Sequence, residues 1–392
     1  MSQIFRAGSV WTGKDMVADA ALVISNGKVQ AVSKERSEGE LDLGKESIIL
    51  PGLVNGHVHL DLSFARIQPT RNFTDWIEKV ISHRMEMSPK MNLEAIRAGV
   101  RESLQAGVTT LGDISPDGAS WEILAEEGLG GTIYFECLGL TPERIDGAIS
   151  RFEEWLLCHE ATSSIQPGIS PHAPHTTSLK IFEYADLCGL PVATHLGETI
   201  EEIQFLGQRC GPFSELLRGM RIDPELCGFR SCEDVLNLFS HARRVGLIHT
   251  NFGNYPSFPG KSHYRVHCPA THAYFSREGT PLNHGGSRGE TWVLATDGRS
   301  SSPNLDLWSQ ARAFAQENPG LESESVLKMI TCQPAKMMGM EKRAGSLVPG
   351  LAADFLVGRL REKVRDAGNV ARQLLDDVES FESVWVSGVR RV

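Results

Sequence analysis

The sequence predicts a (β/α)₈ barrel of the TIM type, flanked by a small β-domain to which both ends of the chain contribute. Two observations lead to this fold class. Eight short apolar runs follow one another through the middle of the 392-residue chain, and helical patterns separate most of them, as expected for a parallel sheet surrounded by helices. Both ends are instead rich in short strand-like runs with glycine at the turns, a texture typical of a separate β-domain.

The barrel is predicted over residues 49–339. Between the apolar runs, segments such as NLEAIRAGVRESLQAG (92–107) place apolar residues at helical spacing. Periodicity alone also allows a doubly wound open sheet, but the chain lacks the GxGxxG and GxxxxGK[ST] loops that bind nucleotide phosphates. The predicted barrel strands are IILPGLVNG, GVTTLGDI, GTIYFECLG, IQPGIS, LPVATHLG, VGLIHT, YRVHCP and TWVLATD.

A composite β-sandwich domain is predicted from residues 1–48 and 340–392. Near the N-terminus, Asn26 and Gly27 indicate a hairpin turn between two β-rich runs. Near the C-terminus, GSLVPGLAADFLVG and SVWVSGVRRV have the same texture. We therefore expect the two ends of the chain to lie side by side in one small domain.

The overall charge and the cysteines limit the class of partner. The net charge of −10 disfavours a nucleic-acid partner, whereas a small-molecule substrate is compatible with it. We see no export signal and no apolar run long enough to span a membrane. The eight scattered cysteines form no Cys-x-x-Cys pair, so we expect reduced thiols in a cytoplasmic protein. Homo-oligomerisation remains open.

Polar residues of one chemical kind stand at the ends of several predicted strands. His57 and His59 end the first run, and alternate residues of a strand point to the same side. His195 ends the fifth run, His249 the sixth and Asp297 the eighth. In a barrel the carboxyl ends of all strands surround one mouth. A lone His-x-His pair is weak evidence, but imidazoles and a carboxylate that converge there predict a divalent metal site, of zinc or ferrous iron.

Glu198 and two further histidines have two interpretations each. Glu198 follows His195 by three residues, where a carboxylate could move protons to and from bound water, or could simply favour the start of the next helix. The segment SPHAPH presents His172 and His175 after the fourth run. Either histidine could contact a substrate or serve only the loop, and His172 is the favoured candidate.

Two other segments are candidates of lower rank. His267, Cys268 and His272 near the seventh run form a conceivable second ligand set, although anchoring of the loop around the intervening proline explains them more simply, and Cys268 is as readily a small buried apolar residue. Residues 250–263 are rich in Gly, Pro and Asn. We expect them to form a long loop at the barrel mouth.

Several segments also carry a family resemblance. PGLVNGHVHLDLS, SPHAPHTTS, THLGET, HCPATHAYF and ATDGRSSSPNLDL resemble the amidohydrolase superfamily over nearly the whole chain. The nearest branch resembles the cytosine-deaminase-like and triazine-hydrolase-like group, which includes adenosine-type, S-adenosylhomocysteine and aminodeoxyfutalosine deaminases. The resemblance implies a metal-dependent enzyme that hydrolyses C–N bonds.

The resemblance also assigns the metal ligands and the catalytic groups. The ligands would be His57, His59, His195 and Asp297. Asp297 would also contact the reacting water, His249 would orient that water or stabilise the intermediate, and Glu198 would be the proton shuttle. The third and fourth runs contain no lysine that could bridge two metals, which favours one divalent ion, zinc first and iron as an alternative.

The substrate contacts implied by the resemblance are His172, Trp76 and Arg84, the last two in the segment NFTDWIEKVISHR. One position departs from the family pattern, because His272 stands where the family more often has asparagine. The long segment 250–263 also falls where the better-known members vary.

The reaction that follows from this assignment is the hydrolytic deamination of an aminated heterocycle, with an adenine-type nucleoside derivative as the substrate. Two alternatives stay open. A hydrolase of the same class could expel chloride from a triazine-like ring or open a cyclic amide, but an acid at the position of Glu198 favours an amine, because ammonia leaves poorly unless it is protonated. A non-catalytic binding or assembly protein on the same scaffold is disfavoured, since no expected ligand is missing.

Overall fold

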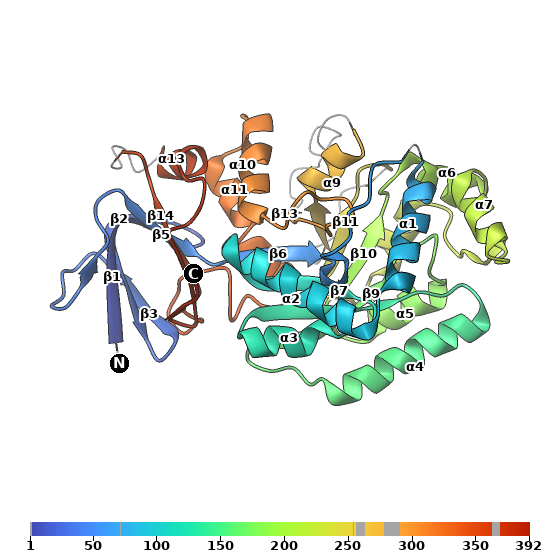
Figure 1. The fold of residues 1–392 in the computed structure, drawn as a ribbon, viewed down its shortest axis with the longest axis horizontal. Helices are drawn as coiled ribbons and strands as arrows, with labels where there is room; N and C mark the ends of the chain where they lie inside the picture. The colour runs from blue at the N-terminus through green and yellow to red at the C-terminus, as the bar shows by residue number, and fades with distance from the viewer. Residues whose placement is uncertain (1, 71, 254, 256–262, 278–290, 363–368) are drawn as a thin grey trace.

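The computed structural model describes residues 2–70, 72–253, 255, 263–277, 291–362 and 369–392. It divides into a sheet built from both chain ends and a barrel built from the middle (Figure 1). Most of the segment 250–263, which we predicted to be a long loop, lies outside the described residues. No helix within the described ranges is long and apolar enough to cross a membrane.

The predicted (β/α)₈ barrel is confirmed. Eight neighbouring strands pair in parallel, in sequence order, and each of the eight apolar runs supplies one of them. Because both faces of a parallel barrel strand are covered, nearly every strand residue is buried. The strands are β6 (Leu53–Val58), β7 (Val108–Ser115), β8 (Gly130–Cys137), β9 (Ile165–Pro171), β10 (Val192–Leu196), β11 (Val245–His249), β12 (His263–His267) and β13 (Thr291–Leu294).

The first and last barrel strands are joined by bonds to the segment that follows β13. The Asp297 amide donates to the His57 carbonyl over 3.2 Å. The Asn55 side-chain amide donates to the Thr296 hydroxyl over 2.7 Å. These bonds bring the carboxyl end of β6 next to Asp297, so that residues far apart in the sequence meet at one mouth.

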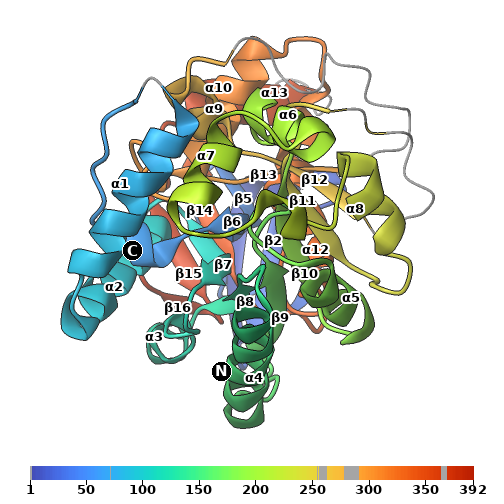
Figure 2. The ribbon, with the colours of Figure 1, turned by 90° about the vertical axis from the view of Figure 1, so that its right-hand side faces the viewer.

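Helices surround the barrel strands (Figure 2). The helix α2 (Pro89–Gln105) shows why they form where they do. The Ser88 hydroxyl caps it by accepting from the Met91 amide, Pro89 is its first residue, and its apolar face is buried. The helices are α1 (Phe73–Glu86), α2 (Pro89–Gln105), α3 (Ser120–Glu127), α4 (Pro142–Cys158), α5 (Leu179–Leu187), α6 (Ile200–Gln208), α7 (Pro212–Gly219), α8 (Cys232–Leu238), α9 (Pro269–Tyr274), α10 (Leu307–Glu317), α11 (Ser323–Met329), α12 (Cys332–Met337) and α13 (Val370–Asp377), with 3₁₀ turns η1 (Leu60–Leu62) and η2 (Pro224–Leu226).

The composite domain of the two ends is one eight-stranded mixed sheet. The N-terminal β1 pairs antiparallel with β2 and parallel with β5, and β5 pairs antiparallel with the C-terminal β14. The domain limits at residues 48 and 340 stay predictions. The strands are β1 (Ser2–Trp11), β2 (Met16–Ser25), β3 (Lys28–Ser33), β4 (Leu41–Asp42), β5 (Ser47–Pro51), β14 (Phe355–Arg359), β15 (Ser383–Val386) and β16 (Val389–Arg390).

A single glycine connects the two sheets. Gly52 lies between β5 of the end sheet and β6 of the barrel. A Cβ at this position would lie 2.2 Å from the Thr109 hydroxyl oxygen, far inside van der Waals contact. The run IILPGLVNG therefore supplies one strand to each sheet, and the glycine lets the chain pass closely over β7.

Candidate active site

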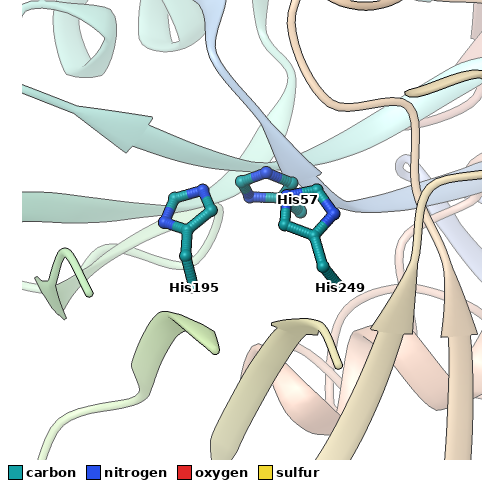
Figure 3. Close-up of side chains that lie close together, drawn as sticks. All are labelled: His57, His195 and His249. Atoms are coloured by element: carbon teal, nitrogen blue, oxygen red, sulfur yellow. The ribbon is translucent and has the colours of Figure 1, made fainter. Parts of the chain in front are cut away.

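Four histidines converge at the carboxyl ends of three barrel strands. His57 and His59 lie at the end of β6, His195 lies in β10, and His249 ends β11. Figure 3 shows the rings of His57, His195 and His249 turned toward one another, and one nitrogen from each lies within 4.8 Å of the others. The Nε2 atoms of His59 and His195 are 3.4 Å apart. The barrel thus brings together the imidazoles that the strand-end pattern predicted.

Asp297 completes the cluster from the segment after β13. Its Oδ1 lies 3.4 Å from Nε2 of His57 and 3.7 Å from Nε2 of His59. Its Oδ2 accepts from the hydroxyls of Thr271 and Ser301, each over 3.0 Å. These two hydroxyls fix the orientation of the carboxylate, so that Oδ1 is directed at the histidines.

The unpaired nitrogens of the cluster fit a metal cation. Both ring nitrogens of His57 and Nδ1 of His59 are buried without a hydrogen-bond partner, and an unsatisfied buried polar atom costs about 1–3 kcal/mol. Burial lowers the pKa of His59 well below its usual value and that of His195 to about 3, so both rings are neutral and keep a lone pair. Neutral imidazoles with one carboxylate are a donor set that divalent zinc or iron accepts.

Glu198 lies at the edge of this cluster, before α6. Its Oε2 is 3.6 Å from Nε2 of His249, and its side chain lines the cavity described below. Burial raises its pKa to about 8. The helix cap is the neighbouring Thr199, whose hydroxyl accepts from the Glu202 amide over 3.1 Å. Capping of α6 therefore does not account for Glu198.

A cavity of about 500 Å³ opens over the cluster. His59, His195, His249, Glu198 and Asp297 form its polar end. The rest of its lining is largely apolar and includes Val80 and Ile81 from α1, Phe213, Leu216 and Leu217 from α7, and Met220 and Ile222. A ligand of nucleoside size fits such a volume.

The three predicted substrate contacts all line this cavity. Nδ1 of His172 lies 2.6 Å from the Thr176 hydroxyl. The Trp76 indole N–H donates to the Ser300 carbonyl over 3.1 Å, and its ring packs against those of Phe73 and Phe275, with centroids 5.3 Å apart in each pair. Arg84 donates through Nε to Asp61 over 2.8 Å, and its Nη2 has no hydrogen-bond partner.

His175, the alternative to His172, also lines the cavity. Its ring centroid lies 4.2 Å from that of Phe213, so it packs against the apolar part of the lining. The backbone carbonyl of His172 lies 3.1 Å from Nδ1 of His195, and it thereby orients a histidine of the cluster. Both histidines of SPHAPH thus lie at the site.

The conceivable second ligand set does not assemble. The ring centroids of His267 and His272 are 5.3 Å apart, but neither residue belongs to a group of candidate metal ligands among the described residues. Burial raises the pKa of the Cys268 thiol well above its usual value, which disfavours the thiolate that binds metals. Cys268 is instead a buried core residue.

Three charged residues at the site were not predicted: Glu136, Arg277, and Arg144, which lines the cavity. Glu136, in β8, lines the cavity, and its Oε1 is buried without a hydrogen-bond partner, 3.9 Å from Nε2 of His172. Burial raises its pKa to about 7, against the effect of the nearby Arg84. Arg277, after α9, places Nη2 at 3.5 Å from Oε1 of Glu198. The single acid in the run GTIYFECLG was the one sequence feature that marked Glu136, and a buried structural acid would give the same pattern, whereas no feature marked Arg277.

The parallel barrel with histidines and an aspartate at its mouth defines a metal-binding barrel hydrolase. The chain belongs to the amidohydrolase family, whose sequence profile matches residues 48–390.

Individual relatives agree with this assignment. The chain is 26% identical over 388 residues to a 5-methylthioadenosine/S-adenosylhomocysteine deaminase of Pyrococcus furiosus, covering 91% of this chain and 86% of the relative. Its fold is similar to that of Helicobacter pylori aminofutalosine deaminase, with a TM-score of 0.84, 19% identity and full coverage of both chains. It is also similar to a zinc complex of atrazine chlorohydrolase from Arthrobacter aurescens, with a TM-score of 0.79, 21% identity and coverage of 99% and 95%.

Proposed function

We propose that this protein is a hydrolytic deaminase whose substrate is an adenine-type nucleoside derivative. The enzyme would use one divalent metal ion, with zinc as the first candidate. The observation that carries the proposal is the buried Glu198 carboxyl, 3.6 Å from His249 at the edge of the histidine cluster. A proton donor placed beside a metal site is what an amine leaving group requires. The curated deaminase relatives, which act on adenosine derivatives by name, support the same reaction.

The metal would be held by His57, His59, His195 and Asp297. When bound, it would supply a Lewis acid that makes water a nucleophile near neutral pH. Asp297 takes the first proton from this water through its carboxylate, which the two hydroxyl donors hold in place.

The remaining steps belong to Glu198 and His249. Water forms a C–O bond to the ring carbon that carries the amino group. Glu198 delivers its proton to the adjacent ring nitrogen and is reprotonated with the proton that Asp297 took from water. It then protonates the amine, so that the C–N bond breaks and ammonia leaves, and the hydroxyl proton of the intermediate returns to Glu198 as the C=O bond forms. His249, buried next to Glu198, stabilises the negative charge that develops on the oxygen. One water is consumed and one ammonia is released in each turnover.

The cavity indicates which nucleosides fit. His172, Trp76 and Arg84 line the cavity together with the apolar side chains of α7. We propose that the base lies at the cluster and that the largely apolar remainder of the lining accepts an uncharged 5′ substituent in place of a phosphate. The same proposal places the enzyme in the cytoplasm, because none of its eight cysteines is paired.

A screen for ammonia release tests the function. Purified protein loaded with zinc or iron would be offered adenosine, 5′-deoxyadenosine, 5-methylthioadenosine, S-adenosylhomocysteine and adenosine monophosphate, together with cytosine and guanine. We expect ammonia from at least one adenine nucleoside and none from adenosine monophosphate. The proposal fails if no aminated purine or pyrimidine is converted.

The second candidate is a hydrolase that expels chloride or opens a cyclic amide. The similarity in fold to atrazine chlorohydrolase favours it. It is distinguished in the same screen by chlorinated triazines and cyclic amides. Hydrolysis of these compounds without ammonia release from any amine would establish this alternative.

A prediction concerns the cavity carboxylate of Glu136. We expect its unpartnered Oε1 to accept from a ribose hydroxyl, so Glu136→Gln should lower kcat/KM on the ribonucleoside by about 10- to 100-fold, the range expected for a hydrogen bond to a charged group. A 2′- or 3′-deoxy substrate lacks the corresponding donor and should lose much less. Equal losses on the ribo- and deoxynucleosides would contradict this contact.

A further inference from the structure

The carboxylate of Glu198 is held between two groups from different parts of the barrel. Its Oε2 lies 3.6 Å from Nε2 of His249 at the end of β11. Its Oε1 lies 3.5 Å from Nη2 of Arg277, just after α9. One carboxylate oxygen thus faces a histidine of the cluster, and the other faces the guanidinium of Arg277.

Arg277 is itself firmly placed. Its backbone amide donates to the His272 carbonyl over 3.1 Å. Its guanidinium carbon lies 4.6 Å from the ring centroid of Phe275 and 5.9 Å from that of Phe73, so it stacks on an aromatic wall. Its side chain is only 8% exposed. A buried cation needs a partner charge, and Glu198 is the carboxylate paired with Arg277.

The backbone around Glu198 is fixed independently of Arg277. The carboxylate of Glu202 accepts from the amides of Gly197 and Glu198 over 3.1 and 2.9 Å, and the Asn251 side chain donates to the Glu198 carbonyl over 3.2 Å. Removal of the Arg277 guanidinium therefore leaves the turn in place and releases only the Glu198 side chain. The role of Arg277 can therefore be tested without disturbing the backbone around Glu198.

We propose that Arg277 is a positioning residue for the reaction: it holds the Glu198 carboxylate beside His249, in the orientation from which the proton reaches the leaving amine. The inference rests on the proposed function for its kinetic consequence, and on the contacts above for the geometry. Misplacement of a general acid lowers the reaction rate strongly, because proton transfer requires heavy-atom distances near hydrogen-bond length.

The kinetic test compares two leaving groups. Arg277→Met should lower kcat by about 10- to 100-fold on the adenine nucleoside, a part of the full general-acid contribution, with KM and metal content near the parent values. The loss on the matching 6-chloropurine nucleoside should be clearly smaller, since chloride leaves without a proton. Arg277→Lys should keep an intermediate rate, and added guanidinium should partly restore Arg277→Met. The control is Arg230→Met, which removes an exposed arginine–glutamate pair. It should leave kcat on both substrates at the parent value.

The geometric test does not depend on turnover. A crystal structure of the metal-loaded Arg277→Met protein with methylthio-coformycin should show the Glu198 carboxylate moved away from His249. An unmoved carboxylate, or equal losses on both leaving groups without rescue by guanidinium, would overturn the role of Arg277. If the parent releases no ammonia from any amine, the proposed function fails, and this structure alone decides whether Arg277 positions Glu198.

Discussion

Glu198→Gln lowers turnover by about 10²–10⁴-fold, the usual contribution of a general acid–base group, while the metal stays bound. Glutamine keeps the shape of the side chain and can still lie near Arg277 and His249, but it carries no transferable carboxyl proton. Metal content is unaffected because Glu198 is not among the proposed ligands. Steady-state kinetics and elemental analysis of the same preparation measure both parts of this prediction.

The neighbouring acid offers a matched control for this variant. Glu201 lies in the first turn of α6 and has no place in the proposed chemistry, so Glu201→Gln should turn over at close to the parent rate. A Glu198→Gln enzyme that binds metal and works as fast as the parent would remove Glu198 from the mechanism.

The double variant His57→Ala, His59→Ala should contain no metal and show no activity. It deletes two of the four proposed ligands, both from the end of β6, and the remaining His195 and Asp297 offer too few donors for a stable site. The metal content measured by elemental analysis should fall from about one divalent ion per chain to background. Circular dichroism of the same protein should show that the barrel still folds.

A histidine outside the cluster controls for the substitution itself. His241 is largely exposed, pairs with Asp186 and is not among the residues that line the cavity, so His241→Ala should keep full metal content. Parent-level metal in the double variant would show that the ion binds elsewhere.

The fold and the metal cluster could be predicted because both follow simple geometric rules. Alternate residues of a strand share a face, which places His57 and His59 together. The carboxyl ends of barrel strands share a mouth, which adds His195 and His249. The eight apolar runs were long and regular enough to count, and each became one strand of the barrel.

The rest of the site depends on contacts that no local pattern encodes. Glu136 is one acid in an apolar strand, and a buried structural acid would give the same sequence. Arg277 meets Glu198 only because the fold brings the residue three positions after α9 beside a residue that follows the fifth strand. The position of the apolar residues of α7 could not be predicted either. The apolar face of an amphipathic helix can pack on the barrel or line a cavity, and Phe213 and Leu217 line the cavity.

The origin of the product oxygen and the fate of the substrate nitrogen show whether the reaction is a hydrolytic deamination. Metal-loaded enzyme would convert the best adenine nucleoside of the screen in water enriched in oxygen-18, with the product analysed by mass spectrometry and the ammonia quantified. We expect one solvent oxygen in each product and one ammonia for each product formed. Deamination is excluded if products form without ammonia, or if the enzyme hydrolyses only chlorinated rings or cyclic amides and leaves every aminated purine and pyrimidine unchanged.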